Sequence, residues 1–482
     1  MNQERSLDKM KKLIISIIVS TLLASCYKDK GNYVIDMPES PVLQNLDTLY
    51  EAMTGDSLVI QPKIVGLAAE NLECDWRIDV PEALVPEANH YKGNALRIVF
   101  GLEAKRYTAR LTVTNKANGM KYFYPFKVQG VTEFSRGTLV LSKDQEESKL
   151  SFIKADNSVQ PNIYEVINGQ PLPAEPLQLH YVKNQFTGNT PLGYWIISKK
   201  GGVRLNVNSL KKESEKPGTL HDNFFLAPPT INVGSFQAHP QGVLLGVIND
   251  KFYGGATTTW DQSATYGMFG TYADGDYDLS SKFVLSTVNN NYTVIGFEKN
   301  KKQFVRINLY GSPMYFGTQY SAIGSDIFNP TNIGMDLLQL VQINNADTYA
   351  YVKNANGQIY ELMFNANFAG PFNFTSGHKR LFIRPEWITA DTKMLASRSG
   401  YIYIAAQNQI FRYNPLSEQV QSLKTDIKGE VTMLKLEDDE STLIAGAAGT
   451  LYYLDIQVGK SGELVKKIEG IPGSPIDMTW RK

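Results

Sequence analysis

The feature that most constrains this 482-residue chain is a hairpin that recurs at nearly even intervals after residue 134. Each copy has an alternating apolar strand, a short polar turn, and a second strand that opens with hydrophobic residues. The second strands begin, at intervals of 41 to 55 residues, with Leu150, Val203, Phe252, Phe304, Ile359, Ile410 and Leu451. This spacing is typical of β-propeller blades of four strands apiece, so seven copies predict seven blades over residues 131–482. A large β-sandwich with coincidental spacing is the alternative.

Residues 34–130 have a different pattern, with about seven short strands expected. Period-two alternation over residues 72–79 and 107–114 predicts half-buried antiparallel strands. A further strand is marked by Leu58, Ile60 and Ile64. A central tryptophan, Trp76, and a tyrosine that opens a late strand, Tyr107, are typical of an immunoglobulin-like sandwich. The predicted fold class is therefore all-β, with an Ig-like sandwich followed by a seven-bladed propeller.

Composition narrows the function classes without naming one. The 48 Lys and Arg residues balance 48 Asp and Glu residues, which excludes nucleic-acid binding driven by a bulk positive field. Hydrophobic residues make up 43% of the chain, which is typical of a globular protein. Two cysteines cannot form a disulfide scaffold or a tetrahedral zinc-thiolate site. We interpret Cys74, in the sandwich, as a small core side chain.

The first 25 residues have the pattern of a secretory signal. A basic segment precedes an apolar run over residues 13–23, which at 11 residues is too short to span a bilayer core of about 30 Å. The sequence Leu23-Ala24-Ser25-Cys26 resembles the lipobox of bacterial lipoproteins, in which the cysteine thiol is acylated after cleavage. We therefore expect a lipid anchor at Cys26, followed by a linker to residue 33, and an outer-membrane location facing the cell surface. A buried apolar strand beside an incidental cysteine is the alternative.

The segment after the predicted anchor, Cys26 to Tyr33, and the strand from Tyr107 to Asn115 resemble the PKD-like family of Bacteroidetes lipoproteins. The second segment is similar to the Y-T-x-x-L-x-V-T-N strand of PKD modules. The resemblance implies a surface accessory protein of a SusC/SusD-type uptake system, which imports glycans or peptides. The resemblance identifies no catalytic residue in this chain.

Catalytic motifs are missing from the sequence. The five histidines include no H-E-x-x-H pair, and the chain has no G-x-S-x-G elbow and no P-loop. Propeller glycosidases need two acids about 5–10 Å apart, which a sequence alone cannot locate. We predict no enzymatic activity, with a polysaccharide hydrolase as the alternative.

One acidic turn has the residue types of a cation site, namely Asp274, Asp276 and Asp278. Alternate carboxylates can wrap Ca²⁺, but Leu279 and Leu285 occupy the positions where an EF-hand has glycine and glutamate. A solvated acidic turn is the favoured interpretation, and calcium is the alternative. No other cofactor is predicted.

Residues 252–277 concentrate aromatic side chains among glycines and threonines, without sustained alternation, and are predicted to form a long loop. Flat rings on such a loop can stack on sugars or grip peptides. A second aromatic set follows in the next repeat. The candidate ligand-binding residues from the two sets are Trp260, Tyr266, Tyr272, Tyr315 and Tyr320. The alternative is that these rings fill blade interfaces or dock the Ig-like domain.

Together these patterns predict a lipid-anchored surface protein that binds glycan or peptide through propeller loops. Two alternatives remain: a docking subunit of the transporter without a ligand of its own, and a propeller hydrolase. The expected partners are the outer membrane and a SusC/SusD-type transporter, with no nucleic acid.

Overall fold

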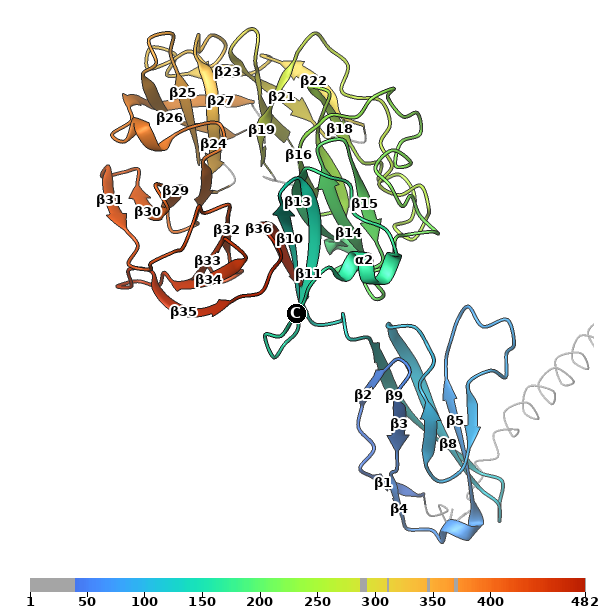
Figure 1. Ribbon diagram of the computed structural model, residues 1–482. Coiled ribbons are helices and arrows are strands. Elements are labelled where there is room, and N and C mark those ends of the chain that lie inside the picture. Colours follow the sequence, from blue (N-terminus) through green and yellow to red (C-terminus); the bar gives the residue numbers. More distant parts are fainter. Residues whose placement is uncertain (1–39, 287–292, 310–311, 345–346, 368–371, 482) are drawn as a thin grey trace, which may run out of the picture. The chain divides into compact units, whose positions relative to one another are not determined.

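The computed structural model describes residues 40–286, 293–309, 312–344, 347–367 and 372–481 (Figure 1). The contacts divide them into a smaller unit, which holds most of residues 40–129, and a larger unit, which holds residues 130–481 with segments 51–56 and 100–105. The predicted signal and lipid anchor at Cys26 lie outside the described residues. Within the described ranges, no helix is long and apolar enough to cross a membrane.

The smaller unit is built of antiparallel strands. Its main sheet has the order β2 (Leu49–Met53), β9 (Lys121–Val131), β8 (Arg106–Asn115), β5 (Leu72–Ile78) and β6 (His90–Lys92). Two smaller sheets pair β3 (Ser57–Ile60) with β7 (Leu96–Val99), and β1 (Val42–Gln44) with β4 (Lys63–Val65). A 3-10 turn, η1 (Ala69–Asn71), precedes β5.

The predicted alternation is present in β5 and β8, where every second side chain is buried. Trp76 is fully buried, and its Nε1 donates a hydrogen bond to the Gly93 carbonyl at 2.8 Å. Cys74 is a buried core side chain, and burial raises the pKa of its thiol. The prediction that Ile64 shares a strand with Leu58 was wrong. Pro62 has no backbone N–H to donate to a ladder, so the chain leaves β3 before it and Ile64 belongs to β4.

The larger unit is a β-propeller, with seven sheets among its described residues. Blade 1 contains β36 (Ser474–Arg481), β10 (Gly137–Asp144), β11 (Glu147–Ile153) and β12 (Val159–Gln160). Blade 2 contains β13 (Pro176–Asn184), β14 (Thr190–Ser198) and β15 (Gly201–Leu205). Blade 3 contains β16 (Val233–His239), β17 (Val243–Ile248) and β18 (Lys251–Gly254). Blade 4 contains β19 (Leu279–Ser286), β20 (Thr293–Glu298), β21 (Gln303–Asn308) and β22 (Met314–Gly317).

The remaining blades complete the ring. Blade 5 contains β24 (Asp336–Gln342), β25 (Asp347–Lys353), β26 (Ile359–Asn367), β27 (Asn373–Leu381) and the parallel strand β23 (Ser321–Ile323). Blade 6 contains β28 (Lys393–Ala396), β29 (Ile402–Ala406), β30 (Gln409–Asn414) and β31 (Gln419–Ser422), after the short turn η4 (Pro385–Trp387). Blade 7 contains β32 (Met433–Leu436), β33 (Thr442–Ala447), β34 (Thr450–Asp455) and β35 (Glu463–Ile468).

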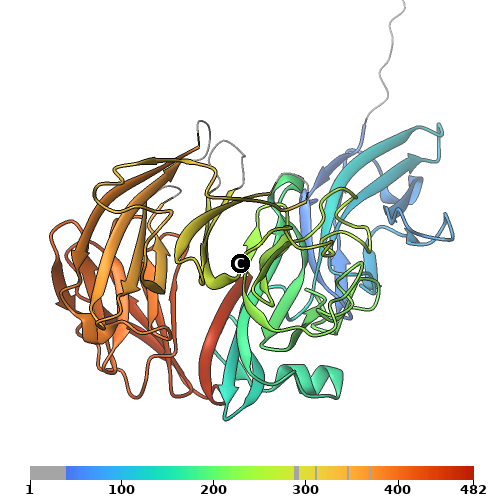
Figure 2. The ribbon, with the colours of Figure 1, turned by 90° about the horizontal axis from the view of Figure 1, so that it is seen from above.

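The ring is closed by strands from both ends of the unit. β36, near the end of the chain, pairs with β10 from Gly137↔Arg481 to Lys143↔Ser474, so it supplies the innermost strand of blade 1 (Figure 2). The innermost strands contact one another in the order β36, β13, β16, β19, β24, β28, β32 and back to β36. The predicted fold class is therefore confirmed, and an open β-sandwich is excluded.

The recurring hairpin of the sequence is formed by the second and third strands of each blade, counted from the axis. The seven second strands of that pattern are β11, β15, β18, β21, β26, β30 and β34. The expectation of four strands in every blade was wrong. As described, blades 2 and 3 have three-stranded ladders and blade 5 has five strands. In blade 3, a glycine-rich segment follows β18 and forms only isolated bridges among the described residues, between Gly255 and Phe269 and between Phe224 and Phe269.

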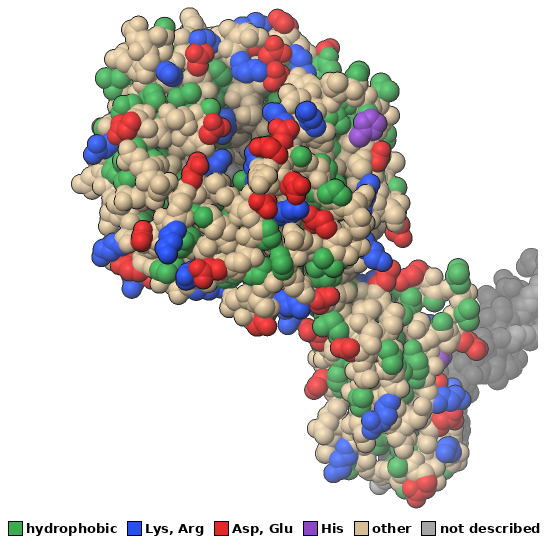
Figure 3. Space-filling view, viewed as in Figure 1, with side chains coloured by type: hydrophobic (Ala, Val, Ile, Leu, Met, Phe, Trp, Pro, Cys, Tyr) green, Lys and Arg blue, Asp and Glu red, His purple; other side chains and the backbone are tan. Residues whose placement is uncertain are grey.

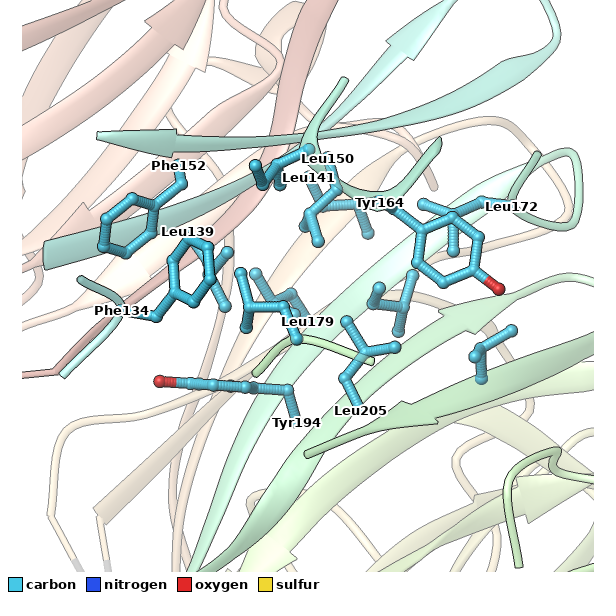
Figure 4. Packing of buried hydrophobic residues seen from close by; sticks show 14 of the residues in the cluster. Phe134, Leu139, Leu141, Leu150, Phe152, Tyr164, Leu172, Leu179, Tyr194 and Leu205 are labelled. Carbon is cyan, nitrogen blue, oxygen red and sulfur yellow. The ribbon is translucent and has the colours of Figure 1, made fainter. Parts of the chain in front are cut away.

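Apolar side chains fill the spaces between neighbouring blades. The cluster between blades 1 and 2 includes Leu141, Leu150, Leu179 and Leu205, together with Tyr164 from helix α2 (Ile163–Asn168) (Figure 4). Burial of such side chains contributes roughly 25 cal/mol per Å² and is the main stabilising term of the ring. Each blade is thus held mainly by the faces it shares with its neighbours.

Polar side chains of the innermost strands also link neighbouring blades. Gln178 of β13 donates to the Phe236 carbonyl at 3.0 Å and accepts from the Phe236 amide at 2.7 Å. Asp477 of β36 accepts the Leu179 amide at 2.9 Å. These bonds fix blades 1, 2 and 3 relative to one another, which positions the candidate site.

Candidate ligand-binding site between blades 2 and 3

The loop between β18 and β19, residues 255–278, follows the last regular strand of blade 3. Backbone hydrogen bonds hold its base, from Ala256 N to Met268 O at 2.9 Å and from Gly267 N to Ala256 O at 2.8 Å. A Cβ on Gly255 would come within 2.8 Å of the Gly267 carbonyl oxygen, so glycine permits the close approach of the two arms. The loop is therefore a folded excursion with a closed base.

Several aromatic rings of this loop are core side chains. Phe269 is fully buried and stacks on Phe236, with ring centroids 5.7 Å apart. Tyr277 is also buried, in the cluster between blades 3 and 4. Tyr266 is only 5% exposed, and its hydroxyl donates to the Gln241 carbonyl at 2.7 Å. Burial, with a smaller contribution from Asp261, raises the pKa of Tyr266 to about 12. These rings fill blade interfaces.

Trp260 differs from them, because its side chain is 83% exposed. Its position is nevertheless fixed through the next residue, Asp261, which is 7% exposed. One oxygen of the Asp261 carboxylate accepts from Asn184 Nδ2 at 3.2 Å and from Thr187 Oγ1 at 2.8 Å. The Asp261 backbone carbonyl accepts from Lys216 Nζ at 2.7 Å. An exposed ring is thus presented by an anchored turn.

Beside Trp260 lies a pocket of about 390 Å³. It is lined by Asn184, Phe186, Thr187, Gln241, Thr257, Thr258, Thr259, Trp260, Asp261 and Tyr266. Phe186, in the 3-10 turn η2 (Gln185–Thr187) between β13 and β14, is 62% exposed and supplies a second ring from blade 2. The site therefore combines residues of two blades.

The lining groups determine which ligands the pocket suits. Three threonines in succession, Thr257, Thr258 and Thr259, offer hydroxyls, and Gln241 offers an amide, whereas the amide of Asn184 is buried and already bonded within the protein. Asp261 is the only Asp, Glu, Lys or Arg among the described lining residues, and its carboxylate is also bonded within the protein. Exposed flat rings beside uncharged donors and acceptors suit a ligand that has both apolar faces and hydroxyl groups.

The structure brings two of the five predicted residues into this pocket, Trp260 and Tyr266. Tyr272 is 39% exposed, lies edge-on to Tyr253 at 5.9 Å and is not a lining residue. Tyr315 is half-buried and stacks on Tyr277 at 4.3 Å. Tyr320 donates its hydroxyl to the Phe304 carbonyl at 2.8 Å and packs on Phe374 of blade 5. The two aromatic sets do not meet in this pocket.

The acidic turn is engaged with basic side chains. Asp276 pairs with Lys301 at 2.9 Å, and Asp278 pairs with Lys251 at 3.3 Å, while Asp274 is exposed. In the part of the chain that is described, no group of three or more His, Cys, Asp or Glu side chains is arranged to hold a metal ion. The pairs favour the interpretation of this segment as a solvated turn.

Sequence reasoning missed the contribution of blade 2. Phe186 lies in the turn Gln185-Phe186-Thr187-Gly188-Asn189, where a lone ring among polar residues and glycine gives the same signal as Trp260. Asp261 had no such signal, because its role depends on contacts with residues more than 70 positions away.

Several solved structures resemble the chain at low identity. The solved structures that resemble the chain include a quinoprotein alcohol dehydrogenase-like protein from Bacteroides thetaiotaomicron, at 11% identity and a TM-score of 0.43, covering 92% of this chain and 100% of that one. The dihydro-haem d1 dehydrogenase NirN, solved in complex with DHE, aligns at 10% identity and a TM-score of 0.39, covering 77% of this chain and 73% of that one. A candidate 6-phosphogluconolactonase from Bacteroides fragilis aligns at 11% identity and a TM-score of 0.40, covering 72% of this chain and 98% of that one. Likenesses at this level carry no conclusion about activity.

No curated protein sequence matches the chain. Residues 26–176 match the PKD-like family, which confirms the resemblance seen in the sequence for that segment. The match covers the smaller unit and continues through β10, β11, β12 and α2 of the propeller. The chain therefore has a PKD-like N-terminal domain and a seven-bladed β-propeller.

Proposed function

We propose that this protein is a lipid-anchored accessory protein of the bacterial cell surface that binds saccharides in the Trp260 pocket and hands them to a SusC/SusD-type uptake system. The PKD-like match supports the surface assignment, and it begins at residue 26, the cysteine predicted to carry the lipid. The propeller then serves as a rigid ligand-binding platform.

The observation that carries the proposal is the exposure of Trp260. A tryptophan that is 83% exposed leaves a large apolar face in water, although the next residue is bonded tightly enough to hold it there. Such a face is expected where a partner covers it. The apolar face of a pyranose ring matches an indole, and its hydroxyls match the threonine hydroxyls and the Gln241 amide of the pocket.

A saccharide fits this site better than a peptide. A peptide chain presents a row of backbone N–H and C=O groups, which are commonly bound by an exposed strand edge or by charged side chains. The pocket instead offers side-chain hydroxyls, the side-chain amide of Gln241 and two exposed rings. Peptide binding is therefore an outcome of the test and not a second proposal.

The test is affinity electrophoresis of the full-length protein in detergent, through gels that contain one polysaccharide each. Wild type is expected to be retarded by at least one polysaccharide, and Trp260→Ala is expected to lose that retardation. Phe225→Ala is the matched control, because Phe225 is a ring with 59% exposure that does not line the pocket. Retardation that Trp260→Ala leaves unchanged would contradict the proposal, as would wild-type binding to peptide pools alone.

The partner is tested separately. Affinity purification of the tagged protein from detergent-solubilised outer membranes is expected to recover a SusC/SusD-type pair, and Cys26→Ser is expected to release the protein into the soluble fraction. Retention of Cys26→Ser in the membrane would remove the lipid anchor from the proposal.

A further inference from the structure

A second pocket lies near the axis of the propeller, also with a volume of about 390 Å³. It is lined by Tyr181, Lys183, Asn189, Lys435, Asp438, Thr479, Trp480 and Arg481. These residues come from the ends of the innermost strands β13, β32 and β36 and from the turns that follow two of them. The surface of the propeller unit is hollowed, with basic and acidic side chains around the hollow (Figure 3).

The charge around the axis is unbalanced. As described, the seven innermost strands carry five basic side chains, Lys183, Lys282, Lys393, Lys435 and Arg481, but only two acidic ones, Asp336 and Asp477. Both acids already have partners, because Asp336 pairs with Lys302 and Asp477 pairs with Lys435, each at 2.8 Å. Three of the five basic side chains, Lys183, Lys435 and Arg481, line this pocket, and such an excess of positive charge favours an anionic ligand.

Two of these cations are available at the pocket. Lys183 is exposed and forms no ion pair among the described residues. Arg481 donates through Nη1 to the Val207 carbonyl at 2.8 Å and to Asn208 Oδ1 at 2.9 Å, which are uncharged acceptors. These bonds orient the guanidinium without neutralising it, and a guanidinium in a fixed position suits a carboxylate or a sulfate. Asp438 is the one acid among the described lining residues.

The axial pocket also presents aromatic surface. Trp480 and Tyr181 both line it and are partly exposed, and Tyr181 packs against Tyr194 with ring centroids 5.0 Å apart. A ligand with an acidic group and an apolar ring face would satisfy both the cations and the rings. An acidic sugar residue has both.

The two pockets flank a single turn. Lys183 and Asn189, at the two ends of the turn between β13 and β14, line the axial pocket. Phe186 and Thr187, in the middle of the same turn, line the Trp260 pocket. A ligand that passes over this turn would therefore reach both pockets.

We propose that the ligand is an acidic oligosaccharide, with a sugar residue at Trp260 and a carboxylate- or sulfate-bearing residue at Lys183 and Arg481. This inference rests on the proposed saccharide binding and specifies its substrate class. The neutral subsite supplies stacking and hydroxyl contacts, and the axial subsite selects for negative charge.

The test compares polysaccharides with their neutral counterparts in affinity electrophoresis of the full-length protein. The probes are polygalacturonate against its fully methyl-esterified form, alginate against its propylene glycol ester, and chondroitin sulfate against desulfated, carboxyl-reduced chondroitin. The variants are the double substitution Lys183→Gln/Arg481→Gln and the single substitution Trp260→Ala. Lys353→Gln is the charge control, because Lys353 is exposed, lines neither pocket and forms no ion pair within the described ranges.

Wild type is expected to bind at least one acidic probe about tenfold or more tightly than its neutral counterpart, since hydrogen bonds to an ionised group are stronger than those between neutral groups. Lys183→Gln/Arg481→Gln is expected to abolish this preference, and Lys353→Gln to keep it. Equal binding of acidic and neutral probes, or a preference that survives the double substitution, would overturn the inference. If neutral probes alone bind and Trp260→Ala removes that binding, the acidic assignment fails while saccharide binding stands. If wild type binds none of the probes, both fail.

Discussion

The replacement of Asp261 by alanine tests how the exposed tryptophan is held, without any knowledge of the ligand. The buried carboxylate accepts hydrogen bonds from Asn184 and Thr187 of blade 2 and a longer one from its neighbour Gln262, and the first two tie the loop of blade 3 to the turn of blade 2. A hydrogen bond to a charged group contributes about 1.5–3 kcal/mol, but Thr187 is exposed and can bond to water after the change. The net loss is therefore about 2–3 kcal/mol of local stability.

Hydrogen exchange reports this loss directly. The amides of Ser263, Tyr266 and Met268 donate within the loop, to the carbonyls of Trp260, Ser263 and Thr265. A loss of about 2–3 kcal/mol should accelerate their exchange roughly 30- to 150-fold, because 1.4 kcal/mol corresponds to a factor of ten. The control is Asp222→Ala, which removes an aspartate that accepts from Thr219 at 2.6 Å but has a side chain 61% exposed. Exchange in Asp261→Ala that matches the wild type at these amides would refute the view that Asp261 anchors Trp260.

Two further predictions concern the stability of the propeller. Glu361 is fully buried and accepts from Arg380, His378 and Tyr351, so Glu361→Ala should lower the free energy of unfolding by about 3–5 kcal/mol in urea titration. Glu469→Ala, which breaks an exposed pair with Lys467, should lower the free energy of unfolding far less because solvent screens that pair, and equal losses in the two variants would argue against the buried network. Burial lowers the pKa of His239 to about 4, and its Nδ1 accepts the Gln241 amide only while it is unprotonated. The stability from neutral His239 is therefore complete above pH 6.5 and is lost as the pH falls towards 4. His239→Gln should reduce the loss of urea-unfolding stability across that window without removing it, because burial also lowers the pKa of His180 to about 4. His221→Gln, with a side chain 70% exposed, should not reduce it.

The propeller could be predicted from the sequence because the repeated pattern has a physical cause. Every blade must bury both faces of its middle hairpin, so apolar pairs such as Ile196-Ile197 recur at the spacing of the blades. The closure of the ring by β36 could not be predicted in the same way. The strand that ends at Arg481 is mixed in polarity, and only its pairing with β10 reveals its place at the axis.

The candidate site was predictable in part. Trp260 gave a local signal, an aromatic ring amid glycine and threonine, and the structure leaves it exposed. Tyr266, from the same segment, is buried, because a folded loop needs its own core and its ring packs on Leu192 and Val243. Phe186 of blade 2 has the same local signal, but its place beside Trp260 could not be predicted, because it depends on how blades 2 and 3 pack. The anchor at Cys26, the surface location and the transporter remain predictions.

The central claim is that the Trp260 pocket binds a saccharide, and isothermal titration calorimetry tests it most directly. An oligosaccharide selected on a glycan array with the wild-type protein is titrated into wild type, Trp260→Ala and Phe225→Ala. The account predicts that the loss of an exposed stacking face weakens binding at least tenfold in Trp260→Ala, while Phe225→Ala binds as the wild type does. Equal affinities for wild type and Trp260→Ala would contradict it.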